Sequence, residues 1–246
     1  MKLIFIRHGD PDYEKDSLTE CGIKEAKLLS RRLKDMKIDY CYESPLGRAQ
    51  LTAKLGLEGS GITPVTCDWL KEFTVRIDRP DCAAEGRKSW VCWDWIPKDW
   101  LTRPELFGVD TWYKDSIMDG GKVGEYYNEV CDSFDRLLAE HGYVRDGLWY
   151  RAEKPNNDTL VFFCHFGVTC VLLSHLMNCS PMILWQGIST APTSLTTVIS
   201  EERREGTAIF RASSIGDVTH LYMAGEQPSF SARFCECYMN EDERHD

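Results

Sequence analysis

The 246-residue sequence lacks the features that mark several large classes of protein. It has no apolar run close to the roughly 18 residues that a transmembrane helix needs. The four apolar residues before Arg7 are too few for the core of a signal peptide. It has no excess of positive charge either, because 29 Lys and Arg stand against 39 Asp and Glu, a net charge of −10. We therefore expect a cytoplasmic protein that binds neither membranes nor nucleic acid.

The eleven cysteines include no C-x-x-C pair. In a cytoplasmic chain of this length we expect free thiols, many of them buried as small apolar side chains. Cys235, Cys237 and His245 are a conceivable zinc site, but their spacing matches no usual structural-zinc pattern. We therefore expect no metal and no other cofactor.

Segments typical of strands alternate with segments typical of helices, which indicates an α/β fold. We expect a three-layer α/β/α sandwich with a mostly parallel central sheet, forming a single domain over residues 1–246. Six of the eight tryptophans fall in residues 68–123, which have no sustained periodicity. We expect this segment to be an insertion that caps the active site, with most tryptophans packed and one or two reaching the pocket.

The expected elements follow from apolar patterning, turn residues and helix caps. Strands are predicted at 2–7, 38–43, 64–67, 159–164, 194–200 and 206–212, with a short one at 217–222. Helices are predicted after Thr19, after Ser44-Pro45, over 124–141 and over 167–178, whereas 143–157 is predicted to be a loop.

Two histidines directly follow the two most convincing buried strands. His8 comes after LIFIR and His165 after LVFFC, and each has a glycine within two residues. Ligands of parallel sheets bind beyond the carboxyl ends of the strands, where helix N-termini favour anions. Arg7 and Arg48 add planar, bidentate donors suited to phosphate oxygens. These residues predict a pocket for a phosphate group.

Several motifs together resemble the histidine phosphatase superfamily, the family of the cofactor-dependent phosphoglycerate mutases. They are R-H-G at 7–9, L-T-x-x-G at 18–22, S-P-L-x-R-A-x-x-T-A at 44–53, an acid after the third strand and the second strand-ending histidine. The resemblance implies three catalytic residues: His8, the nucleophile that becomes phosphohistidine, Glu72 in W-L-K-E-F, the proton donor, and His165. It further implies that Arg7, Arg48 and His165 bind the phosphoryl group.

The sequence also departs from this pattern. The start is R-H-G-D-P, and the second histidine stands in C-H-F-G, so Cys164 and Phe166 are expected to alter the pocket lining. Glu125 and Asp10 are alternative proton donors. The E-R-H-Y-G block of the phosphoglycerate mutases is absent after Glu72, which argues for a phosphatase.

We therefore expect an acid-type histidine phosphatase, a metal-independent phosphomonoesterase that hydrolyses a small phosphorylated metabolite. The alternatives are a phosphoglycerate mutase and a non-catalytic protein that binds phosphorylated ligands. A homodimer formed through exposed aromatic residues is a further hypothesis. Because the two arginines disfavour positive charge on His8, we also expect the pKa of this nucleophile to be lowered.

Overall fold

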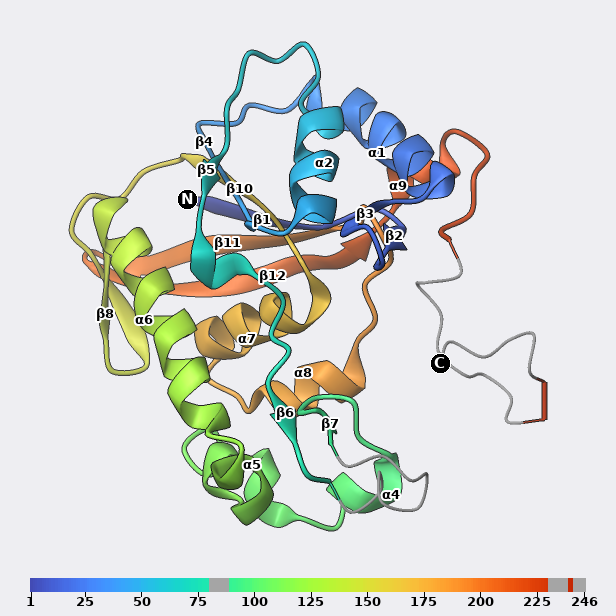
Figure 1. Ribbon diagram of the computed structural model, residues 1–246. Helices are drawn as coiled ribbons and strands as arrows, with labels where there is room; N and C mark the ends of the chain where they lie inside the picture. Colours follow the sequence, from blue (N-terminus) through green and yellow to red (C-terminus); the bar gives the residue numbers. More distant parts are fainter. Residues whose placement is uncertain (80–88, 230–238, 241–246) are drawn as a thin grey trace.

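The computed structural model describes residues 1–79, 89–229 and 239–240. Its centre is an eight-stranded mixed sheet in the order β5-β4-β10-β1-β11-β12-β9-β8 (Figure 1). The strands are β1 (Lys2–Arg7), β4 (Tyr40–Glu43), β5 (Val65–Thr66), β8 (Tyr143–Asp146), β9 (Trp149–Ala152), β10 (Thr159–Cys164), β11 (Leu195–Arg204) and β12 (Thr207–Asp217). Two further short strands, β2 (Pro11–Asp12) and β3 (Ser17–Leu18), form a separate pair.

Half of the sheet is parallel, and this half carries the two histidines. Strands β5, β4, β10 and β1 run parallel to one another, whereas β11, β12, β9 and β8 continue the sheet in antiparallel fashion. In the register of β1 and β10, Arg7 pairs with Cys164. Since His8 and His165 each come next along the chain, the register itself places them side by side.

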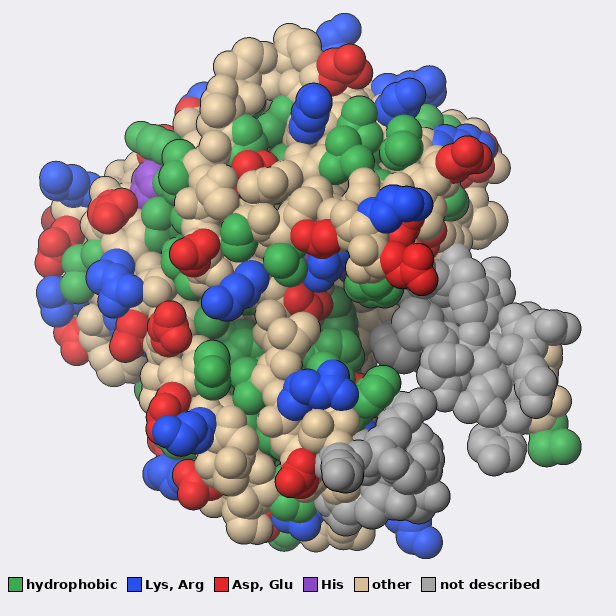
Figure 2. All heavy atoms as spheres, in the orientation of Figure 1, with side chains coloured by type: hydrophobic (Ala, Val, Ile, Leu, Met, Phe, Trp, Pro, Cys, Tyr) green, Lys and Arg blue, Asp and Glu red, His purple; other side chains and the backbone are tan. Residues whose placement is uncertain are grey.

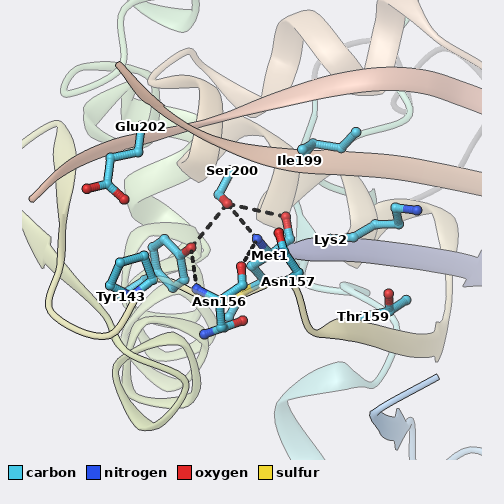
Figure 3. Close-up of a pocket in the computed structure, with 10 residues that line it drawn as sticks. Met1, Lys2, Tyr143, Asn156, Asn157, Thr159, Ile199, Ser200 and Glu202 are labelled. Carbon is cyan, nitrogen blue, oxygen red and sulfur yellow. Dashed lines mark hydrogen bonds between the residues drawn. The ribbon is translucent and has the colours of Figure 1, made fainter. Parts of the chain in front are cut away.

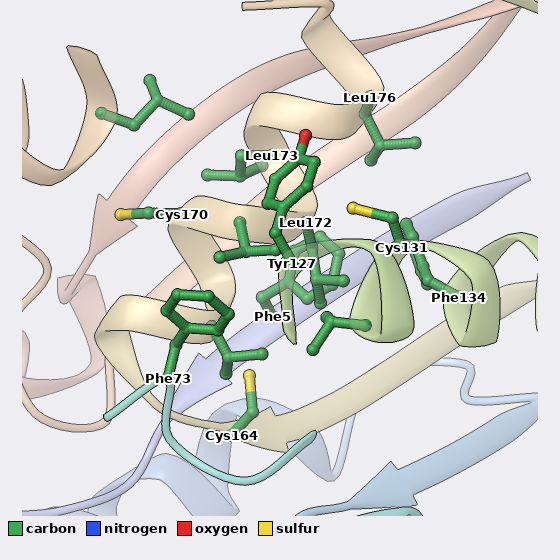
Figure 4. Packing of buried hydrophobic residues seen from close by; sticks show 14 of the residues in the cluster. Phe5, Phe73, Tyr127, Cys131, Phe134, Cys164, Cys170, Leu172, Leu173 and Leu176 are labelled. Carbon is green, nitrogen blue, oxygen red and sulfur yellow. The ribbon is translucent and has the colours of Figure 1, made fainter. Parts of the chain in front are cut away.

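Helices cover both faces of the sheet, which confirms the predicted α/β/α layers. Helices α1 (Glu20–Leu33) and α2 (Gly47–Gly56) lie above it in Figure 1, and α6 (Val123–Glu140), α7 (Phe166–Met177) and α8 (Pro181–Gly187) lie below. The lower core contains Phe5 of β1, Phe134 of α6 and Leu172 of α7, all fully buried (Figure 4). Helix α7 is buried on nearly every side, which explains its continuous apolar sequence.

Where the structure describes it, the tryptophan-rich segment forms short elements, and those from residue 76 onward lie below the sheet in Figure 1. They are η1 (Asp68–Leu70), β6 (Arg76–Ile77), β7 (Trp90–Val91), α4 (Pro97–Trp100), η2 (Pro104–Phe107), η3 (Trp112–Lys114) and α5 (Ser116–Gly120). Trp112 is completely buried and meets Trp185 of α8 edge-on, with ring centroids 5.6 Å apart. Trp95 and Trp100 are also buried. Packing is therefore the role of these three tryptophans, as expected.

Two predicted segments are wrong. Residues 143–157 are not a loop, because β8 and β9 form a hairpin whose turn has Gly147 at φ +61°. Asp146 pairs with Trp149, so the turn residues are Gly147 and Leu148, and glycine is the residue preferred at the first central position of a type II′ hairpin turn. Residues 217–222 are not a strand, because the carboxylate of Asp217 accepts the backbone N–H of Thr219 at 2.8 Å. The short helix α9 (Thr219–Tyr222) begins there, with Val218 as its N-cap residue.

A cavity of about 450 Å³ lies at the amino end of β1, opposite the two histidines (Figure 3). Its polar groups largely bond to each other: the amino group of Met1 donates to the carbonyl of Asn156 at 2.6 Å and to Ser200 Oγ at 2.8 Å. This cavity is therefore separate from the predicted phosphate pocket. Among the residues described, no helix has the length and apolar character that crossing a bilayer requires.

Candidate active site

His8 is held in one tautomer by two groups that have fixed roles. Its Nδ1 lies 2.7 Å from the carbonyl oxygen of Gly9, which can only accept, so Nδ1 carries the proton. Its Nε2 lies 3.3 Å from Nε of Arg48, which can only donate. The imidazole is therefore neutral, with its lone pair on Nε2. It is almost completely buried.

The electrostatic surroundings reinforce the neutral state of His8. Burial is the largest influence that lowers its pKa well below the ordinary 6.5, and the charges of Arg7 and Arg48 act in the same direction. The hydrogen bond to Gly9 opposes them without reversing the shift. The lowered pKa expected from the sequence is thus present, with burial as its main cause.

His165 faces His8, with ring centroids 5.0 Å apart. Its Nε2 lies 2.7 Å from the hydroxyl of Ser44, at the end of β4, and its Nδ1 is buried with no hydrogen-bond partner among the described residues. Burial and the neighbouring His8 lower the pKa of His165 well below its usual value. His8, His165 and Ser44 each follow one of three adjacent parallel strands, and they therefore lie close together at the carboxyl edge of the sheet, as predicted.

Arg48, the second predicted arginine, is positioned by a residue that the sequence did not single out. Its Nη1 donates to Oδ1 of Asp16 at 2.6 Å, and Oδ2 of Asp16 accepts the backbone N–H of Gly47 at 2.7 Å. Burial opposes the charged form of Asp16, but these hydrogen bonds lower its pKa on balance. A Cβ on Gly47 would lie 2.3 Å from the Asp16 carbonyl, so only glycine fits there.

Arg7 is fixed from the other side of the site. Its Nη1 donates to the carbonyl of Thr190 at 2.6 Å, in the connection between α8 and β11. Burial lowers the pKa of Arg7, while nearby Tyr13, Glu72 and Glu25 raise it. The sequence does not indicate the contact with Thr190, because every residue has a backbone carbonyl and no residue type marks the one that accepts this bond.

Glu72 reaches the first turn of α7, directly after His165. Its Oε1 accepts the backbone N–H groups of Phe73 at 2.8 Å and Val168 at 3.0 Å. Within the described parts of the chain, Oε2 has no hydrogen-bond partner. A Cβ on Gly167 would lie 2.7 Å from Oε1, so this glycine is what allows the carboxylate to approach the helix. The structure thus brings Glu72 to the start of α7 and close enough to Arg7 to influence its charge.

The two alternative carboxylates are placed differently. Oδ2 of Asp10 accepts the hydroxyl of Thr19 at 2.6 Å, so this carboxylate is engaged in the loop that leads into α1. Glu125 is exposed and forms an ion pair with Lys122 in the first turn of α6. In Figure 1 this end of α6 lies beside α5, far below the end of β1. Of the three candidates, Glu72 is the one whose carboxylate lies at the start of α7, directly after His165.

The two residues that flank His165 do not both line the pocket. Cys164 is completely buried in the lower core, where its Sγ lies 3.3 Å from Thr169 Oγ1 (Figure 4). The expectation for Cys164 is therefore wrong, because a residue at the end of a buried strand alternates to the opposite face from its neighbour. Phe166 packs edge-on against Trp93, with ring centroids 5.8 Å apart.

Trp93, one of the tryptophans of the tryptophan-rich segment, lies against the first turn of α7. Its Nε1 donates to the carbonyl of Phe73 at 2.7 Å, and a Cβ on Gly167 would lie 2.9 Å from the same atom. Figure 2 shows hydrophobic side chains in a recess on this face, between the part with the sheet and the part with the insertion. Charged side chains of both signs lie above the recess.

No group of three His, Cys, Asp or Glu side chains suited to a metal ion occurs in residues 1–79, 89–229 and 239–240. The predicted combination of Cys235, Cys237 and His245 lies outside these described residues.

Comparisons with known proteins agree with this arrangement. Residues 3–100 match the family model described as the histidine phosphatase superfamily (branch 1). A protein of Yersinia pestis described as a probable phosphoglycerate mutase is 31% identical over 102 residues, which are 37% of this chain and 47% of that protein. A Yersinia pseudotuberculosis protein of the same description matches equally. The match thus spans about half the length of these relatives.

Solved structures match over nearly the whole fold. Phosphoserine phosphatase of Entamoeba histolytica, in complex with 3-phosphoglyceric acid, has a TM-score of 0.58 at 19% identity and covers 89% of this chain and 98% of its own. The alpha-ribazole phosphatase of Shigella flexneri has a TM-score of 0.54 at 20% identity, covering 89% and 97%. The chain therefore has the histidine phosphatase fold. Together with the matching residues 3–100, this confirms the resemblance to the histidine phosphatase superfamily.

Proposed function

We propose that this protein is a metal-independent phosphomonoesterase that hydrolyses a small phosphorylated metabolite through a phosphohistidine on His8. The observation that carries the proposal is the tautomer of His8. The carbonyl of Gly9 accepts a hydrogen bond from Nδ1–H, so the lone pair is on Nε2, where phosphorus would take the place of the Arg48 Nε–H donor, beside His165. A histidine that attacks phosphorus must be neutral, and this one is kept neutral by its surroundings.

In the first step, Nε2 of His8 forms a bond to phosphorus as the bond between phosphorus and the ester oxygen breaks. Arg7 and Arg48 place positive charge where the negative charge of the transferring phosphoryl group gathers. His165 offers its buried Nδ1 to a phosphoryl oxygen, with Ser44 holding the opposite side of the ring. Because both arginines are anchored before substrate arrives, little reorganisation is needed in the transition state.

Glu72 completes the chemistry as acid and then base. Its Oε1 is fixed by two backbone N–H groups, which leaves Oε2 to donate a proton to the departing alkoxide. In the second step, the same carboxylate takes a proton from water. The water oxygen bonds to phosphorus as the bond between phosphorus and Nε2 of His8 breaks. Inorganic phosphate is released, and His8 returns to its neutral state.

A phosphoglycerate mutase is the second candidate, because the Yersinia relatives are described as such. The absence of E-R-H-Y-G after Glu72 in this chain favours the phosphatase. A protein that only binds phosphorylated ligands would not need a nucleophile held in one tautomer, so the bonds of His8 favour an enzyme. The phosphate-ester substrate is proposed on the convergence of Arg7, Arg48 and His165 around His8 and on the phosphatases that share the fold.

The test is phosphate release from an aryl phosphate by the purified protein, with chelator present, from about pH 5 to about pH 8. We expect turnover by the wild type and none by His8→Ala. His141→Ala is the matched control: this partly buried histidine bonds to Tyr42 and not to the site, so its variant should retain activity. Mass spectrometry of base-quenched reactions should find phosphate on His8.

Absence of phosphate release from the wild type under all these conditions would refute the phosphatase. Phosphoryl exchange on phosphoglycerate by the same preparation would then identify a mutase. Binding of a phosphate ester with neither reaction would identify a ligand-binding protein.

A further inference from the structure

Thr193 has a backbone conformation that its side chain disfavours. Its φ is +57°, in the left-handed region, and it is completely buried. Glycine, asparagine and aspartate tolerate this region, whereas a β-branched residue there is a genuine outlier. Such strain persists only where surrounding contacts impose it, and it concentrates at functional sites.

The contacts of Thr193 lead directly to the proposed nucleophile. Its backbone N–H is shared between the carbonyl oxygens of Arg7, at 3.1 Å, and His8, at 3.2 Å. The neighbouring carbonyl of Ser194 accepts the N–H of Arg7 at 3.2 Å. The strained residue therefore holds the backbone from which both the nucleophile and a phosphate-binding arginine project. A left-handed conformation is what turns the N–H of Thr193 toward these two carbonyls while the chain continues into β11.

The side chain of Thr193 is held by a buried histidine that the proposed reaction does not use. Its Oγ1 donates to the carbonyl of Pro192 at 2.7 Å, and His220 of α9 lies 3.0 Å from the same oxygen through Nε2. Because the single hydroxyl proton goes to Pro192, Nε2 of His220 must be the donor. The other nitrogen of His220, Nδ1, is buried without a hydrogen-bond partner among the described residues. His220 is therefore a neutral histidine whose ring, within the part of the chain that the structure describes, hydrogen-bonds only to Thr193.

We propose that Thr193 and His220 form a positioning pair, in which His220 holds Thr193 in its left-handed conformation and Thr193 sets the place of His8 through the shared backbone hydrogen bond. This inference rests on the proposed function of His8. Neither residue touches the reacting atoms. The pair acts on the distance and angle at which Nε2 of His8 meets phosphorus, a geometry on which the rate depends steeply.

The prediction is that losing this contact lowers kcat while leaving substrate binding nearly intact. Thr193→Val keeps the shape and removes the hydroxyl, and His220→Leu removes the donor. Each should lower kcat by about 10- to 100-fold, the cost of a misplacement near 1 Å. KM should change by less than about threefold, since Arg7, Arg48 and His165 keep their own anchors. Thr193→Ser and His220→Gln restore the hydroxyl and the Nε2–H donor, and should recover most of the activity.

Leu221→Ala is the control for a role in stability alone. Leu221 is fully buried in α9 next to His220 and packs with Leu28 and Val218. Its truncation should lower the melting temperature about as much as His220→Leu does, with kcat unchanged below the melting transition. If His220→Leu and Thr193→Val fold and retain the wild-type kcat, the proposal is overturned. If both fail to fold, His220→Gln and Thr193→Ser decide it: rescue of kcat supports the pair, and folded but impaired enzymes refute it.

A second measurement tests the positioning pair independently of the proposed phosphatase activity. The ring nitrogens of His8 report its tautomer and environment in ¹⁵N NMR spectra whether or not the protein turns over. Should the wild type release no phosphate, the proposed function fails. The positioning pair would still be supported by a shift of the His8 nitrogen resonances in Thr193→Val that Thr193→Ser reverses. Unchanged His8 resonances in Thr193→Val would refute it.

Discussion

Oε1 of Glu72 accepts a hydrogen bond from the backbone N–H of Val168 at 3.0 Å. This contact joins the tryptophan-rich insertion to the helix that begins at the second histidine. The first turn of a helix presents unpaired N–H groups and the positive end of its dipole, so it holds a carboxylate well. The tryptophan-rich segment therefore places at the start of α7 the carboxylate that the proposed second step uses as its base.

Gly167→Ala should disturb this arrangement from the helix side. The added methyl would lie 2.7 Å from Oε1 of Glu72 and 2.9 Å from Nε1 of Trp93, so one of them must move. We expect kcat to fall about 10- to 100-fold for alkyl phosphates, whose leaving groups need a proton. The loss should be much smaller for aryl phosphates with good leaving groups. The measurement is kcat across a series of leaving groups.

The matched control for this substitution is Gly120→Ala in α5, where a methyl group meets nothing within 4 Å. It should behave as the wild type with every leaving group. Equal losses for alkyl and aryl esters in Gly167→Ala would contradict the assignment of Glu72 as the acid.

The pH dependence of the nucleophile follows from its burial and its two arginines. Since the pKa of His8 lies well below 6.5, the acid limb of kcat/KM that belongs to His8 should also lie well below pH 6.5. Arg48→Gln removes a positive charge from beside Nε2. Without that charge the protonated ring is less disfavoured, so the pKa of His8 should rise. An NMR titration of the His8 ring measures this even where the variant has lost activity.

Arg32→Gln provides the comparison, because Arg32 bonds to Asp217 rather than to His8. The pKa of His8 in this variant should equal that of the wild type. A pKa of His8 that does not move in Arg48→Gln would show that burial and Arg7 alone keep the ring neutral.

The strand ends of this site were predictable from sequence, and the loops were not. His8 and His165 could be located because a buried strand followed by a polar residue points to the carboxyl edge of a parallel sheet. Asp16 and Thr193 could not, because their roles depend on where a loop folds back onto another element. Both have positive φ, at +46° and +57°. Aspartate tolerates that conformation, but many aspartates do not adopt it, and threonine disfavours it, so residue type does not locate either position.

Asp16→Ala should show how far Arg48 depends on its anchor. Without this carboxylate, the guanidinium loses its 2.6 Å partner and the N–H of Gly47 loses its acceptor. We expect kcat to fall by about tenfold, because the charge of Arg48 remains but is no longer held toward the phosphoryl group. Asp16→Asn keeps one acceptor oxygen and should lose less. Steady-state kinetics with one aryl phosphate measures both.

Asp12→Ala tests whether the loop as a whole is responsible. Asp12 ends β2, directly before the turn that contains Asp16, and bonds to the exposed Lys15 instead of to Arg48. This variant should retain the wild-type kcat. A loss as large as that of Asp16→Ala would mean that the loop matters for its shape and not for its contact with Arg48.

Protein stability should fall steeply on the acid side of neutrality. Burial lowers the pKa of His220 to about 4, and burial also holds those of His8 and His165 well below 6.5. Between the lowered folded values and 6.5, the unfolded chain binds more protons than the folded one, so stability is fully present above about pH 6.5 and declines as the pH falls. Each such histidine contributes a slope of at most about 1.4 kcal/mol per pH unit.

His220→Gln should therefore flatten the dependence of the free energy of unfolding on pH between about 6.5 and about 4, by close to that one-histidine slope. Chemical denaturation at a series of pH values measures it. Leu221→Ala, which loses packing but no titrating group, should lower stability by a similar amount at every pH and leave the slope unchanged. A wild-type slope in His220→Gln would mean that His220 titrates normally in the folded protein, and the buried, neutral state assigned to it would have to be abandoned.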